Sequence, residues 1–148
     1  MLKRFLAVII STIIVSLGIS LLNYVPLGQR ESDVYYFGIG EYFLFASYIF
    51  FIFYVVIGLP ISWLLDKYRK RLRTKPVVIQ YCIGVLVYSL MGLLLGTVYH
   101  FALGSIQFNL NIFIETLGYW FTAAFCYFHV LWIFERRTIK KSQTSSLG

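Results

Sequence analysis

Long apolar segments alternate with short polar ones along this chain. Four segments are almost continuously hydrophobic, and they cover residues 5–25, 41–65, 77–103 and 112–134. Each has about the 20 residues that a helix needs to cross the hydrocarbon core of a bilayer. Because backbone polar groups find no water to bond to in lipid, such segments are expected to be helical. The pattern predicts an all-α integral membrane protein, a bundle of four transmembrane helices.

The polar interruptions indicate how these helices are oriented. Residues 1–4 and 135–148 are basic, whereas the segment 26–40 has a single cation, Arg30. Residues 66–76, between the second and third apolar segments, carry six cations: Lys67, Arg69, Lys70, Arg71, Arg73 and Lys75. Cytoplasmic loops of membrane proteins have an excess of Lys and Arg. We therefore expect this basic loop and both termini on the cytoplasmic side, with residues 26–40 outside.

Local signals predict irregularities within two of the helices. Pro60 lies near the inner end of the second apolar segment, where it removes a backbone donor and clashes with the carbonyl of Val56. A kink is expected there, with the hydroxyl of Ser62 helping to satisfy the freed backbone group. Asn111 precedes the fourth segment and is a suitable N-cap. The tail from residue 135 is basic and then Ser-rich, which favours disorder at its end.

Composition and charge narrow the class of protein. Of the 148 residues, 59% are hydrophobic and only 13% are charged, so a single domain of this size would expose much apolar surface in water. The net charge of +7 first suggests nucleic-acid binding. However, twelve of the thirteen Lys and Arg residues cluster at the ends of apolar segments, where orientation in a membrane explains them. We expect no nucleic-acid partner and a multi-pass protein of the cytoplasmic membrane.

Small and polar residues recur at helical spacing on the spans. The third span has Gly92 and Gly96 in a Gly-x-x-x-Gly arrangement, and the fourth has Gly118 and Thr122 four residues apart. Residues at such intervals share a helix face, and small side chains let two helices approach closely in lipid. We predict that these two stripes face each other. Further stripe members are Cys82, Ser89, His100, Glu115, Cys126 and His129, and Thr12, Ser16 and Ser20 form a stripe on the first span.

Ionisable and soft side chains within the spans are the candidates for chemistry. His100 and Glu115 come to similar depth near the outer face, and intramembrane ionisable residues often serve as proton or ion relays. Both lie close to a helix end, so a hydrogen-bonded pair closing the bundle is preferred over a relay. Cys82, Cys126 and His129 offer soft metal ligands toward the inner face. They lack a fourth ligand and a metal-binding spacing, so no metal or cofactor is predicted.

The sequence contains no motif of a hydrolase, a phosphate-binding loop or a thiol oxidoreductase. We therefore predict a non-enzymatic membrane subunit or regulator whose basic loop, from Lys67 to Lys75, contacts anionic lipid headgroups or another membrane protein. The alternative is a small transporter or channel that works as a homo-oligomer and uses Glu115 and His100, with Glu41 and His129 as further candidates. An intramembrane enzyme is the least favoured class, because no base lies within reach of a nucleophile.

Overall fold

Four long helices make up the fold. The computed structural model describes residues 2–64, 76–103 and 109–144, without the side chains of 103 and 137–144. These residues include no strand, and they form four helices that are long and apolar enough to cross a membrane: Leu2–Leu22, Ile39–Leu64, Val77–Ala102 and Leu110–Arg136. Among the described residues, the predictions of helical structure and of four helices long and apolar enough to span a membrane are confirmed.

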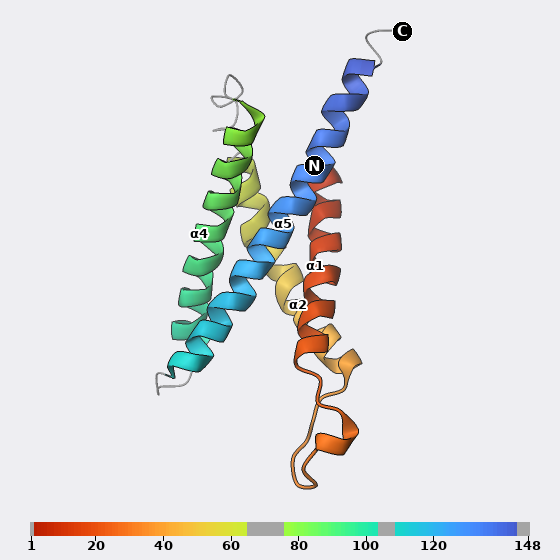
Figure 1. The fold of residues 1–148 in the computed structure, drawn as a ribbon, viewed down its shortest axis with the longest axis vertical. Helices are drawn as coiled ribbons and strands as arrows, with labels where there is room; N and C mark the ends of the chain where they lie inside the picture. The colour runs from red at the N-terminus through yellow and green to blue at the C-terminus, as the bar shows by residue number, and fades with distance from the viewer. Residues whose placement is uncertain (1, 65–75, 104–108, 145–148) are drawn as a thin grey trace.

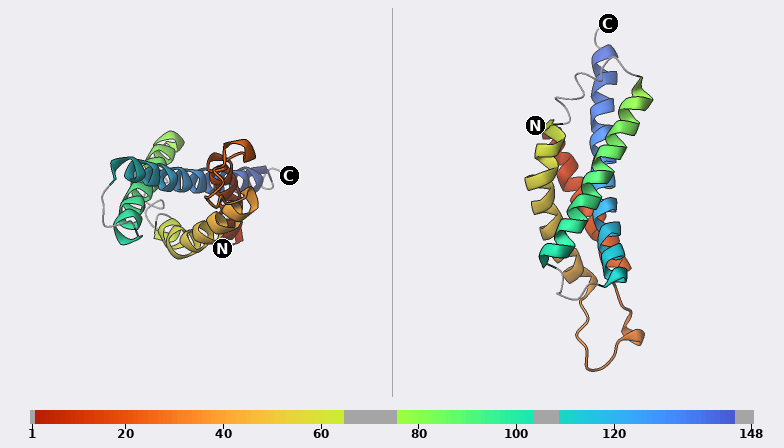
Figure 2. Two further views of the ribbon diagram at one scale, coloured as in Figure 1. Left: turned by 90° about the horizontal axis from the view of Figure 1, so that it is seen from below. Right: turned by 90° about the vertical axis from the view of Figure 1, so that its left-hand side faces the viewer.

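The helices run up and down between two ends of the molecule (Figure 1). Their bounds are α1 Leu2–Leu22, α2 Ile39–Phe53 continued by η2 Tyr54–Gly58, α4 Val77–Leu103 and α5 Leu110–Thr144, with a short turn η1 Leu27–Gln29 between α1 and α2. We call the end where α1 and α4 begin the basic end, because Lys3, Arg4 and Arg136 lie toward it. The other end, with residues 23–38 and the first turns of α2 and α5, is the loop end (Figure 2).

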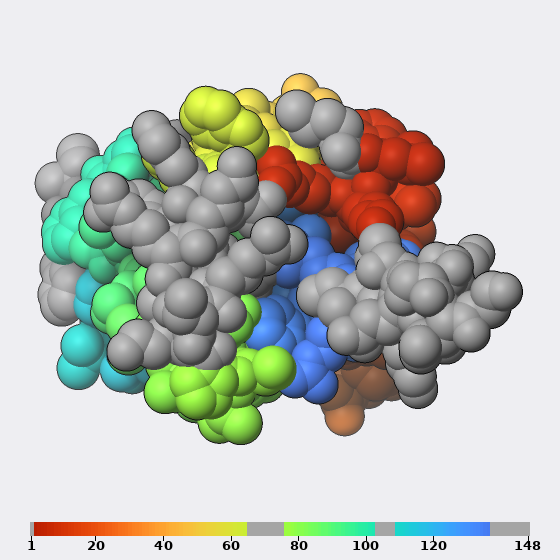
Figure 3. Space-filling model, turned by 90° about the horizontal axis from the view of Figure 1, so that it is seen from above, coloured from red at the N-terminus to blue at the C-terminus, as the bar shows by residue number. Residues whose placement is uncertain are grey.

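The helix α5 lies between the other elements. It packs along α4 on one side and along α1 on the other, and α1 packs along α2. A view onto the basic end shows the same order, with α5 between α4 and the pair formed by α1 and α2 (Figure 3). The main contacts between the α1–α2 pair and the α4–α5 pair therefore involve α5.

Aromatic side chains connect α2 to α5 in the core. The indole ring of Trp120 lies 4.2 Å from the ring of Phe53 and 5.4 Å from that of Phe50, measured between centroids. The ring of Tyr54 stacks on Tyr127 at 5.2 Å, and its hydroxyl donates a 2.8 Å hydrogen bond to the carbonyl of Ala123. In lipid, where apolar contact alone gives little preference between partners, such interhelical packing and hydrogen bonding hold helices together.

The helix irregularities differ in detail from those predicted. Before Pro60 the second span widens into the π-helical segment η2, in which the N–H of Leu59 donates to the carbonyl of Tyr54. Such a bulge accommodates the extra space that a proline ring requires in a helix. Ser62 donates to the carbonyl of Leu59 at 2.8 Å, not to Val56. The helix then continues to residue 64.

The ends of α5 also correct the sequence prediction. Its N-cap is Asn109, whose side-chain oxygen accepts from the N–H of Asn111 at 3.0 Å and from that of Ile112 at 3.4 Å. Asn111, the predicted cap, is already part of the helix, because α5 begins at Leu110 and Asn109 supplies the polar cap. At its other end the helix runs through Thr144, well into the segment predicted as a tail.

Candidate functional site

The face of α4 that packs on α5 is built around glycines. A Cβ atom at Gly92 would lie 2.8 Å from both the carbonyl oxygen of Trp120 and the Cβ of Ala124. At Gly96 the nearest atoms would be side-chain atoms of Trp120 and Leu117, at 3.1 and 3.2 Å. Carbon atoms normally keep about 3.5 to 4.0 Å apart. Gly92 and Gly96 therefore let α5 approach to a distance that a larger residue at 92 would prevent.

The α5 side of this contact is not the predicted stripe. Trp120 and Ala124 meet the glycines of α4, whereas Gly118 has no atom within 4 Å of an added Cβ, and Thr122 is exposed. At 100° per residue, Gly118 lies about 200° around the helix from Trp120. A large ring packed over glycine buries more apolar area than two small residues would. The residues Asn111, Glu115, Gly118 and Thr122 are all exposed, and we call them the outward face of α5.

Of the two residues that were predicted to pair, His100 is buried and Glu115 is exposed. His100 is only 8% exposed, and its ring centroid is 5.0 Å from that of Phe113. Glu115 is exposed and follows Phe113 by two residues, about 200° around α5. The structure does not bring the two side chains together, because the ring of Phe113 occupies the position on α5 that faces His100.

His129 joins α5 to α4 near the basic end. Its Nδ1 lies 2.8 Å from the carbonyl of Phe125, and its Nε2 lies 2.7 Å from the hydroxyl of Tyr81. Since a carbonyl only accepts, Nδ1 carries the hydrogen and Nε2 accepts from Tyr81. The described residues contain no group of three His, Cys, Asp or Glu side chains that could hold a metal ion. Cys82 is exposed and Cys126 is half-buried, and both are free thiols.

The hydroxyl stripe of α1 points into the bundle. Ser11, Thr12, Ser16 and Ser20 are all buried. The hydroxyl of Ser20 donates to the carbonyl of Ser16 at 2.6 Å, whereas the hydroxyls of Thr12 and Ser16 have no hydrogen-bond partner among the described residues. Small side chains in this row allow close packing of α1 on α2 and α5. The buried polar interior of the described bundle therefore consists mainly of hydroxyl groups.

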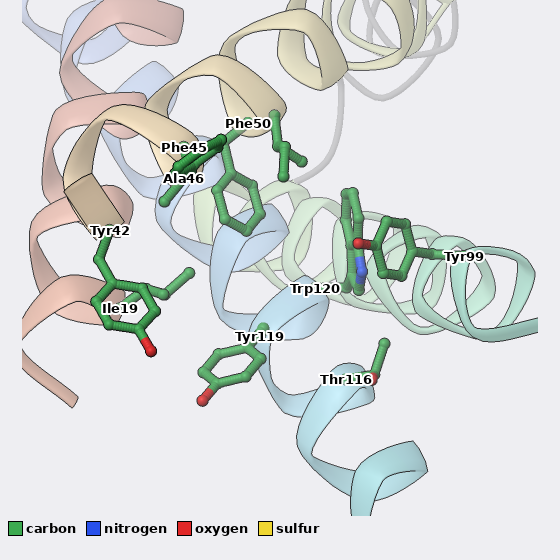
Figure 4. A pocket seen from close by; sticks show the side chains of 10 residues that line it. Ile19, Tyr42, Phe45, Ala46, Phe50, Tyr99, Thr116, Tyr119 and Trp120 are labelled. Carbon is green, nitrogen blue, oxygen red and sulfur yellow. The ribbon is translucent and has the colours of Figure 1, made fainter. Parts of the chain in front are cut away.

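An open-sided cavity of about 230 Å³ lies toward the loop end, between the α1–α2 pair and the α4–α5 pair. Figure 4 shows Tyr42, Phe50, Tyr119 and Trp120 around this space. We call it the aromatic cleft, and its six aromatic residues are Tyr42, Phe45, Phe50, Tyr99, Tyr119 and Trp120. The sequence did not single these residues out. They come from three different helices, so no spacing along the chain connects them.

Charged groups near the loop end are held by local contacts. Glu41 accepts a 2.7 Å hydrogen bond from the N–H of Gly38 and a 2.8 Å bond from the hydroxyl of Tyr35. The bond to the Glu41 carboxylate and its negative charge raise the pKa of the Tyr35 phenol above its usual value near 10. Arg30 donates to the carbonyl of Val25 at 2.9 Å, and its guanidinium lies 5.6 Å from the ring of Tyr24. Glu41 thus caps the first turn of α2 and adds a negative charge there.

The basic end is only partly described. The predicted contact for anionic lipid (Lys67, Arg69, Lys70, Arg71, Arg73 and Lys75) lies outside the described residues. Of the neighbouring cations, Arg136 places its guanidinium 5.1 Å from the centre of the Trp132 ring. Aromatic rings and cations at a helix end are typical of membrane interfaces.

No protein-family model, no curated protein and no solved structure matches this chain. What the protein does is therefore inferred from its own residues.

Proposed function

We propose that this protein is a non-enzymatic subunit or regulator in a membrane, and that the outward face of α5 contacts another membrane protein. The basic residues 67–75 are proposed to contact anionic lipid headgroups or an acidic surface of that partner at the cytoplasmic side. The proposal places the protein in the cytoplasmic membrane with both termini inside, as the distribution of Lys and Arg favours.

The observation that supports this proposal is the polarity of the outward face of α5. Glu115 and Thr122 are exposed on a helix that is apolar enough to cross a membrane, and the space beside Gly118 is open. An ionised carboxylate facing hydrocarbon costs about 2.5 to 3.5 kcal/mol at mid-membrane, and less near the interface. A neighbouring helix that offers donors to Glu115 and packs closely on Gly118 would remove that cost.

Cross-linking in native membranes tests this contact. We would place benzoylphenylalanine at Thr122 and, as a matched control, at Leu90, which is 58% exposed on α4. Both positions lie about 18 to 20 Å along their helices from the loop end, so they sample the same depth. The proposal requires a discrete adduct from position 122, identified by mass spectrometry and lost with Gly118→Leu, and only diffuse lipid adducts from position 90. Lipid adducts alone from both positions would refute it.

A second candidate function, a homo-oligomeric transporter, is favoured by one feature only. Glu115 faces outward, so an oligomer that joined copies through α5 would place this ionisable group between them. His129 would contribute little, because both of its ring nitrogens are already hydrogen-bonded. The test is proton and ion flux into liposomes that contain the purified protein, compared with Glu115→Gln and His100→Ala. Flux that Glu115→Gln abolishes would favour the transporter over the subunit.

A further inference from the structure

The aromatic cleft is lined by aromatic rings and lies toward the loop end, where most of the described charged residues are acidic. We propose that it binds an organic cation of the quaternary ammonium type. The residues that line the cleft are not those of the outward face of α5. Only the charge of Glu115 belongs to both arguments, so the ring variants below test the cleft independently of a partner on that face.

The first argument is the density of aromatic rings. Trp120 forms one wall, with the rings of Phe50 and Tyr99 at 5.4 and 5.2 Å from its own. Tyr42 and Tyr119 border the same space from α2 and α5 (Figure 4). Aromatic faces attract cations within about 6 Å, and cages of several rings are the usual site for quaternary ammonium groups. In a 230 Å³ cavity, which has roughly the volume of eight waters, a trimethylammonium group would contact several rings at once.

The second argument is charge complementarity. The described residues at the loop end include four acids, Glu31, Asp33, Glu41 and Glu115, and one cation, Arg30, which gives a net charge of −3. Glu115 directly precedes Thr116, a lining residue of the cleft, and lies one turn before Tyr119. The other cations whose side chains the structure describes, Lys3, Arg4 and Arg136, lie toward the basic end. The resulting field favours a cation in the cleft over an anion or a neutral molecule.

A lipid acyl chain is the competing occupant. It would fill the apolar part of the cleft, but it would gain nothing from the ring quadrupoles or from the acidic loop end. A neutral molecule with the shape of the cation therefore distinguishes a cation site from an apolar space that would hold a lipid chain, because only a cation site should prefer the charged molecule. Choline and 3,3-dimethyl-1-butanol form such a pair, because a tert-butyl group replaces the trimethylammonium group.

The experiment uses the full chain in detergent micelles with Trp120 as its only tryptophan, after Trp63→Phe and Trp132→Phe. Titration with choline is expected to give a saturable change in Trp120 fluorescence, and 3,3-dimethyl-1-butanol should bind at least tenfold more weakly. Trp120 is only 6% exposed, so direct quenching by solute in solution contributes little. Circular dichroism establishes that each variant is folded before it is titrated.

Paired variants test the two arguments separately. Tyr42→Leu removes a ring and should weaken choline binding about fivefold, whereas Tyr42→Phe keeps the ring and should bind as the parent does. Tyr48→Leu is the matched control, since Tyr48 is on the same helix, 69% exposed and not part of the cleft. The charge argument is tested by removing one acid. Glu115→Gln should weaken choline binding and lower the salt dependence of that binding. Glu135→Gln, which removes an acid at the basic end, should leave both unchanged.

Two results would overturn the proposal. Equal affinity for choline and its neutral isostere would mean that the cleft is an apolar space that accepts any small molecule or a lipid chain. A folded protein in which Trp120 does not respond to choline up to 100 mM, with no heat of binding by calorimetry, would exclude a quaternary ammonium site.

Discussion

The contact between α4 and α5 makes a quantitative prediction about glycine substitutions. A methyl group at Gly92 would lie 2.8 Å from the carbonyl oxygen of Trp120 and 3.1 Å from the Cα of Phe121. These are backbone atoms, which cannot move without displacing the helix. At Gly118, on the outward face of α5, the same methyl group would meet no atom within 4 Å. Gly92→Ala and Gly118→Ala are therefore the same chemical change in opposite surroundings.

The expected magnitudes follow from two opposing effects. Overpacking of a well-packed contact costs about 1 to 3 kcal/mol. Replacing a helical glycine by alanine gains about 0.5 to 1 kcal/mol from reduced backbone freedom in the unfolded chain. For Gly92→Ala the two effects together lower the free energy of unfolding by roughly 0 to 2.5 kcal/mol, with a central value of about 1 kcal/mol. Gly96→Ala should cost less, because its closest neighbours are side-chain atoms of Trp120 and Leu117 that can shift.

The assay is reversible unfolding of the purified protein in mixed micelles with increasing SDS, followed by circular dichroism and tryptophan fluorescence. The predicted order of stability is Gly118→Ala at or above the parent, then Gly96→Ala, then Gly92→Ala. If Gly92→Ala were as stable as Gly118→Ala, the close approach of α4 to α5 would be refuted. A destabilised Gly118→Ala would instead indicate that the outward face of α5 is covered within the purified protein.

Three further predictions test other contacts. Ser16→Ala should leave the free energy of unfolding unchanged or raise it by up to about 1 kcal/mol, because the buried Ser16 hydroxyl has no described partner, while Ser16→Leu should destabilise by overpacking. Tyr54→Phe should lower it by about 0.5 to 1.5 kcal/mol in the same unfolding assay, since the hydrogen bond to the Ala123 carbonyl is lost. The Tyr35 phenol should titrate above its usual pKa near 10 by ultraviolet absorbance, and Glu41→Gln should return its pKa toward that value. Because the pKa is raised in the folded state, the bond contributes fully below pH 10 and is lost as the pH rises through the folded pKa; an unchanged titration in Glu41→Gln would contradict this.

The four helices and their approximate bounds could be predicted from the sequence because membrane spanning depends on a local quantity. About 20 consecutive apolar residues suffice, whatever surrounds them. The predicted spans therefore overlap the observed ones along most of their length, for example 77–103 against Val77–Leu103. The helix ends were predicted less well, since the choice between Asn109 and Asn111 as N-cap depends on where the preceding chain runs.

Only the tertiary structure decided which face of α5 packs against α4. In a soluble protein, the apolar face of a helix must be buried, and the hydrophobic pattern reveals it. Apolar residues lie on every side of α5, so its hydrophobic pattern does not show whether the stripe with Gly118 or the stripe with Trp120 packs inward. The rings of α5 fit the glycine surface of α4, and that fit turned Glu115 and Thr122 outward. The aromatic cleft arises in the same way: its residues lie far apart in the chain, and only the packing of three helices brings their rings around one space.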